Sequence, residues 1–274
     1  MTTGFDGLAG AGQRRATAGT EASPLVPAGI RTIGPPPPSA TRIVLVRHGE
    51  AVCNVSGVCG GPIGCEGLTD PGRSQVALLR DRLALTGELA GADALYASVL
   101  PRAIETAELL APALVAHDAE GERAKPPVPL LECGLCELHP GDADGLDWSE
   151  FTERFGPLDW DADPHRPIAP GGESWAGFVN RVAGALDTLS SRHAGQLVVV
   201  ACHAGVIEAS LLAKVPVVGG LDGARLQLRT RHASMTTWEV DDGRWRLLGY
   251  NDTSHREVVA SAGEASDGGE ASDG

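Results

Sequence analysis

The sequence predicts an α/β fold, because two continuous apolar runs alternate with segments that have the apolar spacing of helices. The runs span residues 43–46 and 197–202, and each is typical of a strand buried on both faces of a parallel sheet. Each run leads into a histidine, His48 or His203, and glycine follows within two residues. The carboxyl ends of parallel strands meet at one edge of an open α/β sheet, so we expect the two histidines to share a ligand site.

Capping residues, apolar stripes and turn residues predict the other elements. Thr69, Asp70 and Pro71 indicate a helix start, and an apolar stripe follows it. Pro101 begins a second helical pattern, after a short strand expected at 94–97. The remaining expectations are extended segments near 128–138, helices at 173–192 and near 205–213, and strands at 225–231, 234–240 and 244–250 with a turn at 241–243. The polar stretch before residue 170 shows no clear element.

Composition predicts one working domain at residues 41–260. Residues 1–40 are rich in Gly, Ala and Thr and end near four consecutive prolines, so we expect a disordered leader. Residues 263–274 are two copies of Gly-Glu-Ala-Ser-Asp-Gly, so a disordered acidic tail is predicted at 261–274.

The charge balance excludes a broad surface for nucleic acid or anionic lipid. The chain has 22 Lys and Arg against 36 Asp and Glu, a formal charge of −14. An anionic substrate must therefore be held by a local cluster of positive groups. No run approaches the roughly 20 apolar residues needed to span a bilayer, so we expect a cytoplasmic protein that acts on a small phosphorylated metabolite, with a homodimer left open.

The segment Leu45-Val-Arg-His-Gly-Glu50, together with His203-Ala-Gly205, resembles the histidine phosphatase superfamily, also called the phosphoglycerate mutase-like family. Residues 68–75 and 98–107 match two further segments of that family in the expected order, and the resemblance spans 41–255. It implies a phosphoglycerate mutase-like fold, a three-layer sandwich with a mostly parallel central sheet flanked by helices.

The resemblance also implies the roles of the site residues. His48 would be the nucleophile that forms a phosphohistidine, with His203 beside it and Glu137 as general acid and base. The phosphate-binding set would comprise Arg47, Asn54, Arg102, Gly49 and Ala204, the last two through the backbone. Phosphate charge would be balanced without a metal or cofactor.

The acid had to be chosen between two glutamates. Glu132 and Glu137 both follow a leucine two residues earlier, but only Glu137 has glycines, Gly141 and Gly145, at the offsets of the family pattern. The segment 170–174 resembles the family's opening of the helix before His203, and we expect it to support the site without taking part in the chemistry.

Several residues depart from the pattern or carry weaker signals. His139, Pro140 and Ala143 differ from the residues common in the family, which leaves the shape of the substrate open. The pair Cys133 and Cys136 forms a C-x-x-C motif, a weak signal for zinc or redox chemistry, so reduced apolar thiols are expected. Surface or loop positions are expected for His117, His165, His193, His232 and His255.

The sequence therefore predicts a phosphatase of small phosphate monoesters. A phosphoglycerate mutase-type transfer is the first alternative, although the stretch between Glu137 and His203 is short and lacks the insertion of such mutases. A phosphate-binding module without turnover is the second. Sugar phosphates, phosphoglycerate, nucleotides, cofactor precursors and phosphoproteins all remain possible substrates.

Overall fold

A mixed six-stranded sheet runs through the residues that the computed structural model describes, 29–116, 124–215 and 228–256. Its order is β3-β2-β4-β1-β5-β6. The strands are β1 (Thr41–Arg47), β2 (Ala94–Ala97), β3 (Leu130–Leu131), β4 (Leu197–Cys202), β5 (Met235–Asp241) and β6 (Arg244–Asp252). Neighbours among β1 to β4 pair in parallel, whereas β5 runs antiparallel to both β1 and β6.

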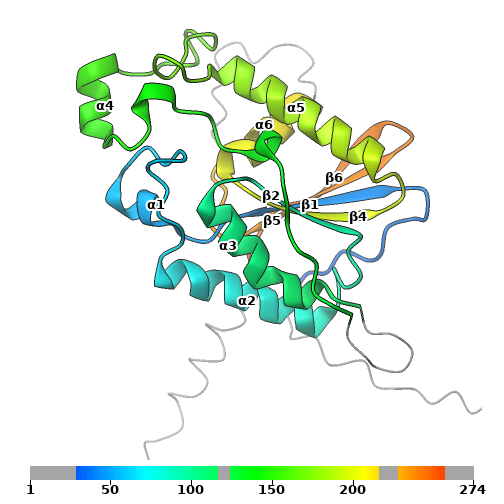
Figure 1. Cartoon of the computed structure of the whole chain (residues 1–274). Helices are drawn as coiled ribbons and strands as arrows, with labels where there is room; N and C mark the ends of the chain where they lie inside the picture. The colour runs from blue at the N-terminus through cyan, green and yellow to red at the C-terminus, as the bar shows by residue number, and fades with distance from the viewer. Residues whose placement is uncertain (1–28, 117–123, 216–227, 257–274) are drawn as a thin grey trace, which may run out of the picture.

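Helices cover both faces of this sheet, which confirms the predicted sandwich of three layers (Figure 1). The helices α5 and α6 lie on one face, and α2 and α3 lie on the other. The bounds are α1 (Val52–Ser56), α2 (Asp70–Thr86), α3 (Pro101–Leu110), α4 (Trp148–Phe155), α5 (Trp175–Arg192) and α6 (Ala204–Lys214), with 3-10 helices at Ala111–Leu114 (η1), Cys133–Leu135 (η2) and Gly141–Ala143 (η3). None of the described helices has the length and apolar character needed to cross a membrane.

The central strand β1 is apolar throughout because both of its faces are covered. Successive side chains of a strand point to opposite faces. Ile43 and Leu45 accordingly pack with α5 and α6, while Val44 and Val46 pack with α2 and α3. The paired strand β4 divides its valines in the same way, so the run of apolar residues that predicted each strand is explained by two cores.

Local capping explains why the predicted helices begin where they do. The Thr69 hydroxyl accepts from the N–H of Gly72, and Ser174 accepts from the N–H of Gly177 at the start of α5. Pro101 occupies the first turn of α3, where its missing N–H costs no hydrogen bond. In the predicted β5–β6 turn, Asp242 and Gly243 both have positive φ, as a type I′ turn requires.

One helix, α4, lies in the stretch where the sequence showed no clear element. Its signal is short: the Asp147 carboxylate accepts from the N–H groups of Ser149 and Glu150, and Phe151 is buried four residues after the cap. Conversely, the extended segments expected near 128–138 reduce to β3 and the 3-10 helix η2. A strand was also expected at 225–231. Its described part, 228–231, is not in a strand, and the other three residues lie outside the described residues.

The folded part begins earlier than the boundary at residue 41 that composition suggested. The carbonyl oxygen of Arg31 accepts from Nη2 of Arg82 at 2.6 Å, and that of Gly34 accepts from Arg42. Residues 1–28 and the expected acidic tail at 261–274 lie outside the described residues.

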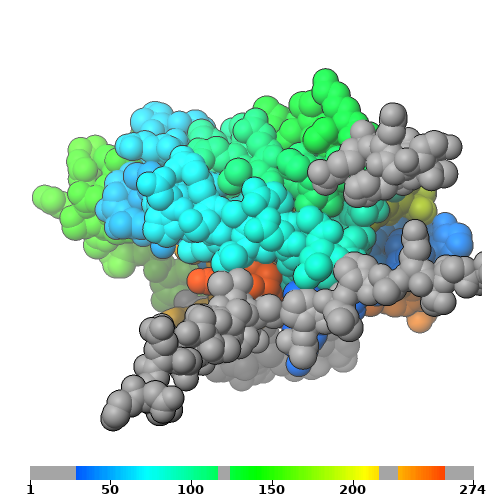
Figure 2. All heavy atoms as spheres, turned by 90° about the horizontal axis from the view of Figure 1, so that it is seen from below, coloured from blue at the N-terminus to red at the C-terminus, as the bar shows by residue number. Residues whose placement is uncertain are grey.

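The buried Arg82 ties three parts of the chain together. Its guanidinium lies 2.7 Å from the Glu88 carboxylate and 2.9 Å from that of Asp252, and it donates to the Ser254 hydroxyl. Figure 2 shows that the last described residues before 257, coloured orange-red, lie directly beside α2 on the surface. Burial alone would raise the pKa of Asp252, but the hydrogen bond from Arg82 and the N–H of Ser254 hold this pKa below its usual value.

Replacing Arg82 should destabilise the protein strongly. Arg82→Met leaves the buried Glu88 carboxylate and the partly exposed Asp252 carboxylate without their cation, and breaking a buried ion pair costs about 3–5 kcal/mol. Urea unfolding measures this loss. The matched control is Arg80→Met on the same helix, where the pair with Asp81 is exposed, so a change of no more than about 0.5 kcal/mol is expected. Equal losses in the two variants would contradict the importance of the buried network.

Candidate active site

His48 follows β1 directly and is buried, and its two hydrogen bonds decide its tautomer. The Nδ1 atom lies 2.6 Å from the carbonyl oxygen of Gly49, which can only accept, so Nδ1 carries the proton. The Nε2 atom accepts from Nε of Arg102 at 3.2 Å, as an unprotonated nitrogen does. The free electron pair of the neutral ring is therefore on Nε2.

The pKa of His48 lies well below 6.5. Burial is the main cause, and the positive charges of Arg102 and then Arg47 add to it. The same causes, burial first, lower the pKa of His203. Both rings are consequently neutral at neutral pH, which a nitrogen nucleophile requires.

Gly49 has a packing role, and its expected phosphate contact stays a prediction. Its N–H donates to the Thr106 hydroxyl at 3.2 Å and is thereby used within the protein. A Cβ at this position would lie 2.4 Å from the carbonyl oxygen of Gly72 and 2.9 Å from a methyl group of Val76. Glycine is required because the turn after β1 passes this close to α2.

The two predicted arginines differ in how they are held. Arg102 is 4% exposed in the first turn of α3, and its Nη1 donates to the carbonyl oxygen of Gly60 at 2.7 Å. Arg47 is half-buried and donates to the carbonyl oxygen of Thr230, while its Nε atom is buried without a partner among the described residues. Both side chains line the cavity that contains His48.

His203 lies beside His48, as the matched strand ends predicted, with 5.1 Å between the ring centroids. Its Nε2 is 2.8 Å from the Ser98 hydroxyl, and its Nδ1 is buried without a partner in the described part of the chain. A buried ring nitrogen without a partner is costly. It is therefore a candidate to hold an oxygen of a bound phosphate.

The two glutamates considered as the acid, Glu137 and Glu132, have different surroundings in the structure. Glu137 lines the cavity, where Oε2 accepts from the N–H of Gly205 at 3.2 Å and Oε1 from that of Leu138. A Cβ on Gly205 would lie 2.2 Å from Oε1, so glycine makes room for the carboxylate. Glu132 instead accepts from the N–H of Gly134 at the start of η2. Its role is to cap that short helix.

Asn54 and Ala204 retain their expected roles only as predictions. Asn54 lines the cavity and is exposed, but its side-chain oxygen Oδ1 accepts from the N–H of Ala51. Ala204 begins α6 and lines a separate hollow that also touches Arg47.

Sequence reasoning missed one histidine near the site and misplaced another. His232, expected on the surface, has its ring centroid 5.7 Å from that of His48, and burial lowers its pKa to about 4. His255 is only 2% exposed. Neither has a motif neighbour, and both are brought inward by β5, β6 and the residues next to these strands. His165 is exposed as expected. The ring nitrogens of His193 form hydrogen bonds with the side chains of Tyr96 and Gln196, and His117 lies outside the described residues.

The cavity has a volume of about 400 Å³ and two chemically different ends. One end holds His48, Arg47, Arg102 and Glu137. The other is apolar and aromatic, formed by Leu138, Pro140, Trp148, Trp160, Ile168 and Trp175. The Asp144 carboxylate joins two loops next to the cavity, because it accepts from the N–H groups of Ile63 and Gly64 at 2.9 Å.

Comparison with known proteins identifies the family of the chain. The sequence model of the histidine phosphatase superfamily (branch 1) matches residues 43–253, which is more than half of the chain. The chain belongs to this superfamily. As a member of the histidine phosphatases, it is a phosphomonoesterase, and its fold is the phosphoglycerate mutase-like fold that the sequence implied.

Individual relatives support the assignment over most of their length. A metal-independent phosphoserine phosphatase of Arabidopsis thaliana is 30% identical over 232 residues, 83% of this chain and 88% of the relative. The structure of YhfR from Bacillus stearothermophilus has 29% identity and a TM-score of 0.62, covering 78% of this chain and 98% of that one. A mycobacterial glucosyl-3-phosphoglycerate phosphatase has 25% identity and a TM-score of 0.59, covering 77% and 98%.

The lowered pKa of His48 predicts how activity depends on pH. Since the ring stays neutral through the ordinary histidine range, kcat/KM should not fall as the pH drops from about 8 to about 6.5. In Arg102→Gln one cause of the lowered pKa is lost, so the acid limb should move to higher pH. Measuring kcat/KM against pH for both proteins tests this; a wild-type acid limb near pH 6.5 would contradict the neutral ring.

Proposed function

We propose that this phosphatase hydrolyses small phosphate monoesters through a phosphohistidine on Nε2 of His48, with Glu137 as its acid and base. The observation that carries the proposal is the pair of hydrogen bonds on the His48 ring. The Gly49 carbonyl keeps the proton on Nδ1, and Arg102 donates to the electron pair on Nε2. The nucleophile is thus unprotonated and already next to a guanidinium group.

The first step is an in-line attack of Nε2 on phosphorus. As the ester binds, the Arg102 N–H exchanges Nε2 for a phosphate oxygen, which frees the electron pair. The bond between phosphorus and the ester oxygen breaks, and a protonated Glu137 gives its proton to the departing alkoxide. Arg47, Arg102 and His203 Nδ1 hold the other phosphate oxygens.

The second step reverses these roles. Glu137, now a carboxylate, takes a proton from water, whose oxygen attacks phosphorus. The bond between phosphorus and Nε2 breaks, which releases inorganic phosphate and restores the neutral ring. His48, Glu137, Arg47 and Arg102 line the cavity, and the His203 ring lies beside that of His48.

Removing the nucleophile or the acid should suppress turnover. His48→Ala abolishes the phosphohistidine route, and Glu137→Gln should lower kcat by about 10²–10⁴-fold, the usual contribution of a general acid. Release of inorganic phosphate from an aryl phosphate measures both. The matched control is Glu132→Gln, which removes the same charge at a position outside the cavity, where the Gln oxygen can still cap η2, and it should leave kcat within about twofold.

The outcomes of this experiment distinguish the alternatives. Equal activity in wild type and His48→Ala would reject the phosphohistidine, and no turnover of any ester by the wild type would favour a binding module. A phosphoglycerate mutase-type enzyme would transfer the phosphoryl group to another hydroxyl, so little inorganic phosphate would appear.

The far end of the cavity also supports a class of leaving group. In the described part of the chain, Arg47 and Arg102 are the only Lys or Arg side chains that line it, and both belong to the phosphate end. A phosphoserine leaving group would bring a carboxylate and an ammonium group against tryptophans. We therefore propose a leaving alcohol with a neutral apolar or ring face, unlike the phosphoserine in the name of the Arabidopsis relative.

A matched pair of esters tests this preference. Phosphoserine and 2-phenylethyl phosphate are both alkyl esters, and we expect kcat/KM to be at least about tenfold higher for the second because its ring can be buried against the tryptophans. In Trp160→Leu this preference should become smaller because KM for 2-phenylethyl phosphate rises. The control is Trp245→Leu, which alters the Trp238–Trp245 contact away from the cavity and should preserve the preference. A higher kcat/KM for phosphoserine would contradict the neutral leaving group but not the phosphatase activity.

A further inference from the structure

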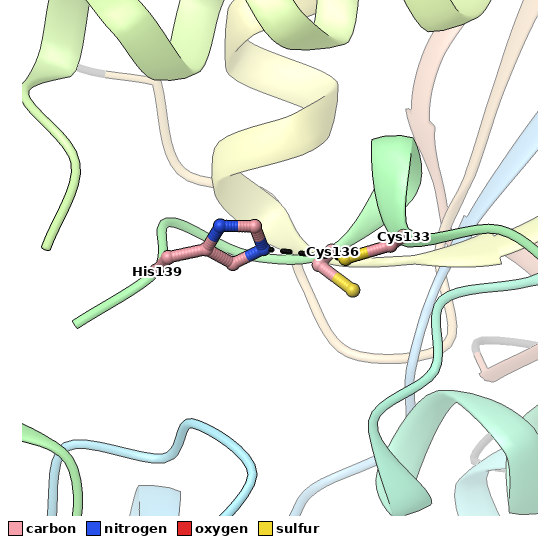
Figure 3. Close-up of side chains that lie close together, drawn as sticks. All are labelled: Cys133, Cys136 and His139. Carbon is pink, nitrogen blue, oxygen red and sulfur yellow. Dashed lines mark hydrogen bonds between the residues drawn. The ribbon is translucent and has the colours of Figure 1, made fainter. Parts of the chain in front are cut away.

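A cluster of metal-binding side chains lies next to the acid Glu137. Cys133, Cys136 and His139 each offer one donor atom, and these atoms lie within 4.8 Å of one another. Figure 3 shows the His139 imidazole facing the Cys133 thiol, both on the loop that carries η2. The C-x-x-C motif alone was a weak signal, and the structure adds His139 as a third donor.

The spacing of two donors already suits a single ion. A tetrahedral zinc ion with bonds of about 2.0–2.3 Å places its sulfur and nitrogen ligands roughly 3.5 Å apart. Cys133 Sγ and His139 Nε2 are 3.5 Å apart. Cys136 Sγ lies within 4.8 Å of both of these atoms and 3.4 Å from Oγ of Ser98, so all three donors are close enough to share one ion after a side-chain adjustment.

The histidine is oriented as metal-binding histidines are. Such a ring usually directs its second nitrogen to a carboxylate, which fixes the ring and its tautomer. His139 Nδ1 lies 3.5 Å from Oε2 of Glu173, and its backbone N–H donates to the same oxygen at 2.9 Å. Nε2 is thereby left with its electron pair toward Cys133.

The loop that supplies the donors is already held in place. Nη1 of Arg181 donates to the carbonyl oxygens of Cys133, Gly134 and Cys136, and its Nη2 donates to that of Glu137. Glu173 neutralises this guanidinium at 2.7 Å. Two thiolates would balance the charge of a divalent ion, so the site can accept one without a net charge being added to the loop.

We propose that Cys133, Cys136 and His139 form a binding site for one Zn²⁺ ion, whose fourth position faces solvent. Thiolate and imidazole donors favour zinc over calcium or magnesium. Cys133 is exposed, which gives the ion a route of entry. Because Glu137 stands between Cys136 and His139, the ion braces the loop that holds the catalytic acid. It does not take part in phosphate chemistry.

Zinc titration of the full chain, with its thiols kept reduced, tests the proposal. Calorimetry should give one Zn²⁺ per chain, and added zinc should raise the melting temperature. Cys133→Ser and His139→Gln should each bind at least about tenfold more weakly, in line with losses at zinc sites. Co²⁺ used as a spectroscopic probe should show thiolate-to-cobalt charge transfer in the wild type, and this should be lost in Cys133→Ser.

Two controls separate this site from other parts of the molecule. His48→Ala should bind zinc with unchanged affinity, so failure of the phosphatase proposal would not affect this one. Cys65→Ser probes the other pair of neighbouring thiols, Cys53 and Cys65, and should also bind normally. Absence of stoichiometric binding, or unchanged affinity in both Cys133→Ser and His139→Gln, would overturn the proposal, as would a loss confined to Cys65→Ser.

Discussion

The hydrogen bonds on the His48 imidazole are the interaction on which the rest of the site depends. A histidine buried beside two guanidinium groups can persist only as the neutral ring, since a third positive charge there would be unpaired. The Gly49 carbonyl and the Arg102 N–H give each ring nitrogen a partner and settle which one carries the proton. The nucleophile is therefore prepared before substrate arrives, and a phosphate oxygen has only to replace Nε2 as the acceptor of Arg102.

This arrangement requires β1 and α3 to keep fixed positions relative to each other, and the Thr106 hydroxyl links them. Thr106 Oγ1 donates to the carbonyl oxygen of Arg102 at 2.8 Å and accepts the N–H of Gly49 at 3.2 Å. The residue after the nucleophile is thus joined to the backbone of the arginine that contacts the nucleophile. The spacing of Arg102 and Thr106, one helical turn, is what the family segment encodes. Since Gly49 also touches the backbone of α2, three elements meet at this one turn.

Features that depend on local sequence could be predicted, and those that depend on tertiary contacts could not. The apolar run of β1, the Thr69 cap and the Asp242-Gly243 turn each carry their own signal. By contrast, nothing beside His232 or His255 in the sequence indicates that the first lies next to His48 and that the second is buried. The motif likewise does not show that the N–H of Gly49 donates to the Thr106 hydroxyl, because that contact joins residues far apart in the sequence. The contacts of Arg31 with Arg82 likewise lie outside any compositional signal.

The position of the acid shows how a loop can be as well fixed as a helix. Glu137 lies between two glycine-containing segments, and its backbone has no ladder of helical hydrogen bonds to hold it. Arg181 replaces that ladder: from the middle of α5 it donates to the carbonyl oxygens around Glu137 and is itself held by Glu173. Glu173 lies in the segment 170–174, just before α5, for which the sequence predicted support without chemistry, and through Arg181 it is connected to the backbone of Glu137. In an acidic chain of net charge −14, the half-buried Arg181 thus holds the loop of Glu137 in place without lining the cavity, whereas Arg47 and Arg102 line the cavity itself.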